Sequence, residues 1–101
     1  MVVLSIDTSS MNVTRISLHI DGRVAYMESD SRVLKSQMTL PLIESLLKKE
    51  KLNFTDITDI NVNTGPGSFT GVRVGISIAN TLSFLYNIPV NGKHELAKAK
   101  Y

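Results

Sequence analysis

Residues 59–75 read DINVNTGPGSFTGVRVG, and this stretch says more about the fold than any other part of the chain. Its first six residues have strand composition, residues 65–67 form a glycine-rich turn, and an apolar-periodic segment follows at once. A strand, a glycine turn and a helix in this order aim free backbone N–H groups at an anion. The helix also carries small residues along one side. The stretch therefore predicts either a phosphate site or a surface for close helix packing.

The flanking sequence predicts an α/β domain. Strands are expected at 2–7, 13–20, 23–29 and 59–64, with Asp21-Gly22 as a two-residue hairpin signal. Helices are expected at 36–51 and 68–86, the second capped by Ser68 and ended at Asn87. A short fifth strand at 89–91 and a further helix over 95–100 complete the pattern. Three antiparallel strands followed by a βαβ unit predict a mixed sheet of about five strands with helices packed on it.

Composition excludes several classes of protein. The 101 residues suffice for one domain, and a net charge of +2 is too small to argue for binding to nucleic acid or a membrane surface. There is no cysteine, which rules out disulfides and thiolate metal sites. No apolar run approaches the roughly 18–20 residues that span a bilayer. The chain is therefore expected to be an ordinary globular protein with no membrane partner.

Known phosphate motifs do not fit the glycine segment. A Walker A loop needs a lysine, and none lies between Lys51 and Lys93. In the dinucleotide fingerprint the third glycine comes one residue earlier than Gly71, and the later acidic residue is missing. A generic anion-friendly helix start remains, whose candidate phosphate-binding residues are Asp7, Thr8, Ser9, Gly65, Gly67, Ser68 and Arg73. The simpler alternatives are that Asp7 caps its turn and that Arg73 forms a salt bridge to Asp7 or to a partner chain.

The second interpretation of the same segment is a packing surface. Gly71, Gly75, Ala79 and Ser83 recur every four residues and form one ridge of small residues on the helix. Each glycine inside a helix costs about 1 kcal/mol relative to alanine, so close approach of another helix is expected to offset that cost. The neighbour is either the first helix of this chain or a helix of a second chain, and the apolar flanks favour the second. On this interpretation Gly75→Leu abolishes pairing and leaves the monomer folded.

Catalytic residues are not evident. His19 and His94 lie far apart with no ligand-spaced neighbour, so a metal site is not expected. Ser68 and Thr70 carry hydroxyl groups without a nearby base, so neither is supported as a nucleophile.

Two segments resemble the TsaB family, also called YeaZ. They are LSIDTS at 4–9 and GPGSFTGVRVG at 65–75, and shorter matches occur at 36–37, 40–43, 55–60 and 88–90. The resemblance implies an actin-like, ribonuclease-H-like fold, with this chain as the first of two domains. It also implies a cytoplasmic, non-catalytic partner of the transferase TsaD in the synthesis of threonylcarbamoyladenosine on tRNA. The small ATPase TsaE would complete the assembly, and tRNA would be reached only through the complex.

The resemblance further implies pairing through the helices at about 36–50 and 68–86, with TsaD or, when the chain is alone, with a second copy. The interface residues expected on this basis are Leu40, Ile43, Leu47, Gly71, Val72, Gly75, Ile76, Ala79 and Ser83. The alternative is an actin-like nucleotide-binding enzyme of the ATPase or kinase type, or a glycoprotease-like protein as older family labels suggest. ATP or ADP would then bind only in the full-length protein or complex. The catalytic relatives carry a histidine pair on the first helix, and this chain has no histidine between His19 and His94.

Overall fold

The computed structural model describes residues 1–30 and 35–99. Its strands are β1 (Val2–Asp7), β2 (Val13–Ile20), β3 (Arg23–Asp30) and β4 (Asp59–Val62). Its helices are α1 (Lys35–Lys49) and α2 (Phe69–Tyr86), with one 3₁₀ turn, η1 (Phe54–Asp56), between α1 and β4. Each expected strand up to residue 64 and both expected helices are therefore confirmed to within two residues at either end.

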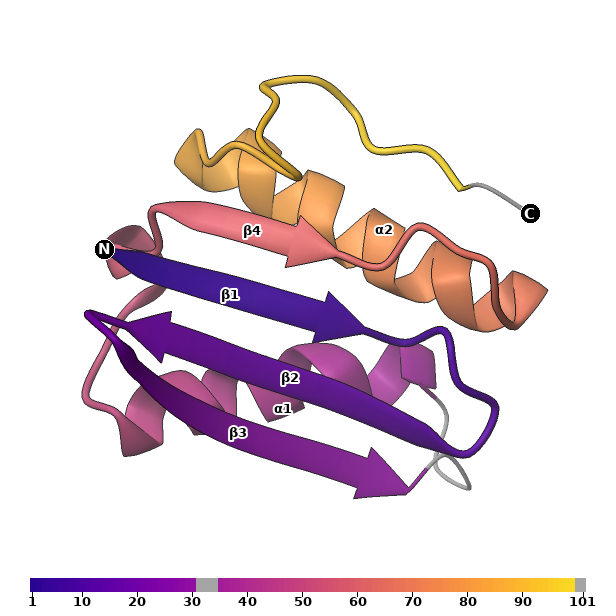
Figure 1. Cartoon of the computed structure of the whole chain (residues 1–101), viewed down its shortest axis with the longest axis horizontal. Helices are drawn as coiled ribbons and strands as arrows, with labels where there is room; N and C mark the ends of the chain where they lie inside the picture. Colours follow the sequence, from indigo (N-terminus) through magenta and orange to yellow (C-terminus); the bar gives the residue numbers. More distant parts are fainter. Residues whose placement is uncertain (31–34, 100–101) are drawn as a thin grey trace.

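The described strands form one mixed sheet in the order β3-β2-β1-β4 (Figure 1). β1 pairs antiparallel with β2 and parallel with β4, while β2 pairs antiparallel with β3. The hairpin turn between β2 and β3 has positive φ at both Asp21 and Gly22, as a two-residue hairpin requires. The carboxyl ends of β1 and β4 consequently lie side by side, which brings the glycine segment next to residues 7–9.

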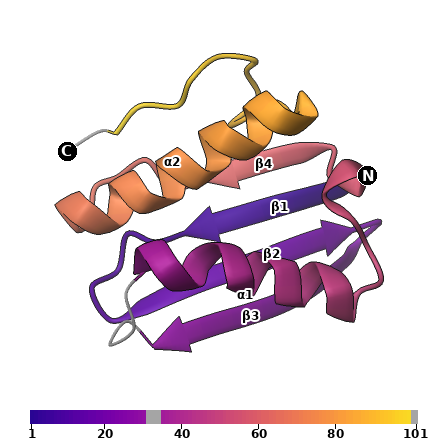
Figure 2. The same ribbon diagram turned by 180° about the vertical axis from the view of Figure 1, so that it is seen from behind.

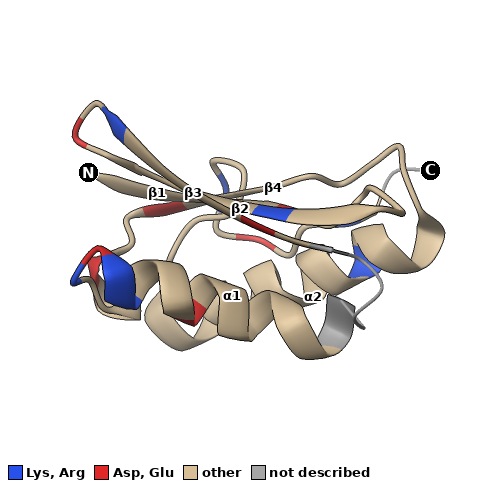
Figure 3. Cartoon of the chain, turned by 90° about the horizontal axis from the view of Figure 1, so that it is seen from below, with Lys and Arg blue, Asp and Glu red and all other residues tan. Residues whose placement is uncertain are grey.

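Both helices cover the same face of the sheet (Figures 2 and 3). The helix-facing side chains of the strands alternate with outward ones, and the buried set includes Leu4, Ile6, Ile16, Leu18, Ile60 and Val62. Ile43 and Leu46 of α1 and Val72 and Ala79 of α2 complete that core, each fully buried. The opposite face has no helix in the described part of the chain and is mostly polar, as expected for a sheet with one solvated side.

Two expected elements at the C-terminal end are wrong. The fifth strand is limited to a single bridge between Val90 and Ile60. Beyond it, the side-chain amide of Asn91, in place of a strand backbone, bonds both the N–H and the C=O of Val62. No helix forms over 93–99; the Asn80 side chain instead holds the backbone N–H and C=O of Ala97. Residue 100, the last of the expected helix, lies outside the described residues.

Candidate functional site

The glycine segment lies directly on the end of β1. The backbone N–H of Ser68 donates to the C=O of Ser9 at 2.9 Å, and a Cβ at Gly67 would lie only 2.6 Å from the Ser9 Cβ. The backbone N–H of Gly65 donates to the Asn63 side-chain oxygen at 2.9 Å. Glycine is thus required at position 67 because the chain must pass closer to Ser9 than a side chain would allow.

The start of α2 satisfies its own backbone groups. The Ser68 side-chain oxygen accepts a hydrogen bond from the backbone N–H of Gly71 at 3.3 Å, which confirms Ser68 as the N-cap. At the other end Asn87 takes a left-handed conformation, and its N–H bonds the C=O of Ser83. Both predicted ends of the helix are therefore confirmed.

Thr8 joins the end of β1 to the interior of α2. Its side chain is fully buried, and its hydroxyl donates to the C=O of Gly71 at 2.5 Å while accepting from the N–H of Gly75 at 3.0 Å. In a regular α-helix that N–H and that C=O are each other's partners. The threonine hydroxyl therefore bonds both members of one N–H and C=O pair of the helix, and in this way it connects the helix to the sheet.

This contact gives the glycines a different role from the one expected. A Cβ at Gly71 would lie 2.2 Å from the backbone oxygen of Thr8, and a Cβ at Gly75 would lie 2.5 Å from the Thr8 hydroxyl oxygen and 3.3 Å from a methyl of Val62. Gly71 and Gly75 are therefore needed because α2 packs closely on Thr8, which follows β1, and on β4. The expectation that they face a second helix is wrong, because the helical period alone does not reveal which element lies against the ridge.

Asp7 is held in place by its neighbours. Its carboxylate accepts hydrogen bonds from the Ser9 N–H at 3.0 Å, the Ser9 hydroxyl at 2.5 Å and the Asn63 amide at 3.3 Å. Partial burial, the largest single influence, raises the pKa of Asp7, but these hydrogen bonds and the positive charge of Arg15 together lower it below its ordinary value. Asp7 therefore stays ionised and caps the turn after β1, as the simpler sequence interpretation expected.

The candidate phosphate residues do not all come together as a site. Asp7, Ser9, Gly67 and Ser68 are adjacent, but Ser9 and Ser68 bond to one another and Asp7 is a negative charge among them. Thr8 is corrected outright, since its hydroxyl is buried and already makes two hydrogen bonds. The N–H groups of residues 65, 68 and 71, which would face an anion, have partners within the chain.

Arg73 lies away from that cluster. Its guanidinium carbon is 4.5 Å from the centre of the Phe69 ring, one turn earlier on α2, and the side chain is exposed. The expected salt bridge to Asp7 is not formed; Asp7 is bonded by Ser9 and Asn63 instead. Among the described residues no carboxylate lies within ion-pair distance of Arg73, so its charge is open to a molecule outside the chain.

Most of the expected interface residues are used inside the monomer. Buried side chains and glycines cannot lend surface to a partner, and this applies to Ile43, Leu47, Gly71, Val72, Gly75, Ile76 and Ala79. Leu40 is 36% exposed and Ser83 is half-buried, so these two remain accessible. The outward side of the helical layer is formed by other residues.

Apart from Arg73, sequence reasoning did not name the outward residues of α2 as candidate site residues. Phe69 is 57% exposed, and with Thr70, Arg73, Val74, Ser77 and Ile78 it lines a groove of about 350 Å³. The signal was present, because Phe69, Arg73 and Ser77 lie four residues apart and therefore share one side of the helix. We call these six residues, together with Leu40 of α1, the outer helical face.

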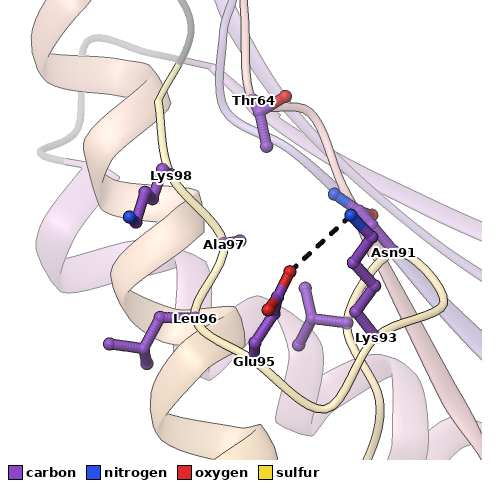
Figure 4. Close-up of a pocket in the computed structure, with 8 residues that line it drawn as sticks. Thr64, Asn91, Lys93, Glu95, Leu96, Ala97 and Lys98 are labelled. Atoms are coloured by element: carbon purple, nitrogen blue, oxygen red, sulfur yellow. Dashed lines mark ion pairs between the residues drawn. The ribbon is translucent and has the colours of Figure 1, made fainter.

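A second hollow lies between the end of β4 and the segment 93–98 (Figure 4). It is about 600 Å³ in volume, and Thr64, Asn91, Leu96 and Lys98 are among its lining residues. Lys93 and Glu95 form an ion pair across it at 3.6 Å, with both side chains 71% exposed. These solvated charges pair with each other and define no catalytic arrangement.

Two kinds of feature are absent from residues 1–30 and 35–99. Within them no group of three or more histidine, cysteine, aspartate or glutamate side chains is placed to hold a metal ion. Nor does either helix in that part of the chain have the length and apolar character needed to cross a membrane.

Comparison with known proteins gives a consistent result. A family model described as TsaD, tRNA N6-adenosine threonylcarbamoyltransferase, matches residues 33–99. The chain is 38% identical over 91 residues to the Escherichia coli tRNA threonylcarbamoyladenosine biosynthesis protein TsaB, covering 89% of this chain and 38% of that protein. It is 40% identical over 70 residues to the tRNA N6-adenosine threonylcarbamoyltransferase of Bacillus subtilis, covering 69% of this chain and 20% of that protein.

A solved structure agrees with these matches. A solved structure of YeaZ from Pseudomonas aeruginosa superposes with a TM-score of 0.83 at 30% identity, over 88% of this chain and 41% of that one. The fold is therefore that of the YeaZ structures. The chain spans about two fifths of the length of the TsaB relatives it matches.

Proposed function

The chain belongs to the TsaB (YeaZ) family, and from that premise we propose that it serves threonylcarbamoyladenosine synthesis on tRNA as a non-catalytic subunit that binds TsaD through its outer helical face. The relatives' names support the pathway. The chain covers about two fifths of those relatives, so the activity and partners of the whole protein are part of the proposal.

The observation that carries the proposal is the contrast between the loop and the helices. In the glycine loop, the N–H groups of residues 65, 68 and 71 bond within the chain, and the Thr8 hydroxyl connects α2 to the end of β1. The outer helical face instead exposes an aromatic ring, half-buried aliphatic side chains and a cation without a carboxylate partner among the described residues. Exposed aromatic and arginine side chains together are typical of interface centres.

The side chains present support the proposed non-catalytic role. Ser68 is occupied as a helix cap, Thr8 is buried, and the sequence has no histidine between positions 19 and 94 to act as base or ligand. The chain is also similar to a transferase of the same group over 70 residues. Two proteins of one fold can pair through equivalent helices, with the catalytic member supplying the chemistry. TsaE and tRNA would reach the assembly through TsaD, and we expect all of them in the cytoplasm.

The test is the mass of a mixture of this chain with its cognate TsaD, measured by light scattering after size exclusion. We expect a complex of one copy of each protein. Ser77→Arg places a long charged side chain in the groove of the outer helical face and should weaken the complex about tenfold or more, because a bound partner would have to bury an unpaired charge there.

The control is Asn61→Arg, which adds the same side chain to an exposed position of β4 on the sheet face that carries no helix. We expect this variant to bind TsaD as the unmodified chain does. Equal weakening by both variants, or no complex at all with the unmodified chain, would contradict the proposal. Unchanged far-ultraviolet circular dichroism of both variants establishes that neither effect reflects misfolding.

A further inference from the structure

Asn91 and Gly92 form an exposed hairpin turn beside the hollow of Figure 4. The N–H of Val90 donates to the C=O of Lys93 at 2.8 Å, and the N–H of Lys93 donates to the C=O of Val90 at 3.1 Å. The φ angle is 51° at Asn91 and 81° at Gly92, as a two-residue hairpin turn requires. In the sequence, Asn91 is the one asparagine that a glycine follows. Glycine has no side chain to keep its backbone nitrogen away from the preceding amide.

The backbone nitrogen of Gly92 is accessible. Its N–H donates no hydrogen bond to any residue within 1–30 or 35–99. A Cβ built at this glycine would meet no atom within 4 Å apart from its chain neighbours, so the space around the residue is open. Neither a hydrogen bond nor crowding therefore hinders an attack by this nitrogen on a neighbouring carbonyl carbon.

The side chain of Asn91 takes the place of a strand at the edge of β4. Its Oδ1 accepts from the N–H of Val62 at 2.9 Å, and its Nδ2 donates to the C=O of Val62 at 3.1 Å. An ionised aspartate or isoaspartate at position 91 has no donor to replace the second bond. It would also place a negatively charged oxygen against the carbonyl oxygen of Val62. Loss of the Asn91 amide would therefore break this contact with β4.

We propose that Asn91 is a site of spontaneous deamidation, and that the reaction releases the turn at 91–92 from Val62. The Gly92 nitrogen attacks the side-chain carbonyl carbon of Asn91, which forms a new C–N bond and closes a succinimide ring. The bond from that carbon to Nδ2 breaks, and Nδ2 leaves as ammonia with the proton from the Gly92 nitrogen. Water then adds to one carbonyl of the ring and opens it to aspartate or isoaspartate. Water is the single co-reactant, and nothing is oxidised or reduced.

The fold controls the rate of this reaction. The two bonds to Val62 hold the Asn91 amide on β4, so the amide must leave Val62 before the ring can close. Two hydrogen bonds of ordinary strength should make the folded chain react about tenfold or more slowly than the unfolded chain.

The consequence extends to the glycine loop. Asn63 directly follows Val62, and its side-chain amide donates to Asp7 at 3.3 Å and to Ser9 at 3.0 Å. Its side-chain oxygen accepts from the N–H of Gly65 at 2.9 Å. Release of Val62 from Asn91 would remove a support from the strand end that carries these bonds. The inference is independent of the proposed function, because neither the reaction nor its measurement involves TsaD.

The reaction is tested by incubating the unmodified folded chain at neutral pH and mapping its peptides by mass spectrometry. Each deamidation adds about 1 Da, and we expect Asn91 to be converted before any other asparagine. Asn87 is the control within the same chain, since it is also exposed and has a φ of 53°. The residue after it, Ile88, is buried and donates its N–H to the C=O of Ser83 at 3.3 Å. Asn87 should remain unmodified when half of Asn91 has reacted.

Conversion of Asn91 no faster than that of Asn87 would overturn the inference. Conversion of Asn91 only in urea, where the chain is unfolded, would overturn it as well.

Asn91→Asp imitates one product and tests the structural consequence. Hydrogen exchange of the Val62 N–H, followed by nuclear magnetic resonance, measures the contact directly because that N–H donates to Asn91. Its exchange rate should rise about tenfold in the variant, the factor that corresponds to one lost hydrogen bond. Asn12→Asp makes the same charge change in an exposed turn and should leave the rate unchanged. An unchanged rate in Asn91→Asp, or an equal rise in both variants, would contradict the proposed release.

Discussion

Alanine at Gly71 is expected to lower the free energy of unfolding by about 2 kcal/mol or more. On helix propensity alone the change would stabilise α2 by about 1 kcal/mol. The added Cβ, however, would lie 2.2 Å from the backbone oxygen of Thr8, and a backbone atom cannot move aside as a flexible side chain can. Overpacking of this kind typically costs about 1–3 kcal/mol, and here it displaces both α2 and the end of β1. Urea unfolding followed by circular dichroism measures the difference.

Ser77→Ala is the matched control, since it places alanine on the exposed side of the same helix. We expect its unfolding free energy to stay within about 0.5 kcal/mol of the unmodified chain. If Gly71→Ala were as stable as this control, α2 would not pack on Thr8 as described. The same contact predicts that Gly75→Leu, expected from sequence to spare the monomer, disrupts it instead.

Replacing Thr8 by valine is expected to cost about 2–3 kcal/mol of stability. Valine has nearly the same shape as threonine, so the change removes the hydroxyl with little loss of volume. The hydrogen bonds of the hydroxyl with the N–H of Gly75 and the C=O of Gly71 would then be lost, and each such bond contributes about 0.5–1.5 kcal/mol. Thermal or urea unfolding at neutral pH measures the loss.

Thr8→Ser separates the hydroxyl from the methyl. Serine keeps the bridge to α2 and removes one methyl group, so its cost should be near 1 kcal/mol and clearly less than that of valine. A serine variant that is less stable than the valine variant would show that packing of the methyl, and not the hydrogen-bonded bridge, holds the helix to the sheet.

The parts of the fold that local signals determine could be predicted from sequence. An apolar, β-branched run predicted the strand at 2–7, and alternation of apolar and polar residues predicted the strand at 13–20. The Asp21-Gly22 pair predicted the hairpin, and Ser68 and Asn87 predicted the ends of α2. Each of these signals acts over a few residues. The resemblance to the TsaB family supplied the order in which the elements are assembled, and the superposition on YeaZ confirms it.

The contacts of the glycine ridge could not be predicted in the same way. Thr8 lies 63 residues before Gly71, and nothing near either residue indicates that they meet. The ridge of small residues predicted a close neighbour correctly but not which one. A salt bridge from Arg73 to Asp7 was likewise one of the alternatives expected from sequence, because a helical wheel does not show that Arg73 lies over Phe69 or that Asn63 already bonds the carboxylate.

The C-terminal elements failed for a related reason. The residues from Glu95 onward have the composition of a helix. The conformation of the C-terminal segment, however, depends on two asparagine side chains that lie outside that pattern. Asn91 bonds the edge of β4 at Val62, and Asn80 bonds the backbone of Ala97 from the side of α2. A side-chain amide that bonds a distant backbone segment, as Asn91 and Asn80 do, produces no periodic pattern in the sequence.

Hydrogen–deuterium exchange of the chain, alone and with TsaD, tests the central claim most directly. The account predicts that TsaD slows exchange in peptides covering α1 and α2, while the β2–β3 hairpin at 13–30 exchanges as before. Slower exchange confined to residues 5–9 and 63–68, with no change in either helix, would show that the glycine loop is the binding site and would contradict the account.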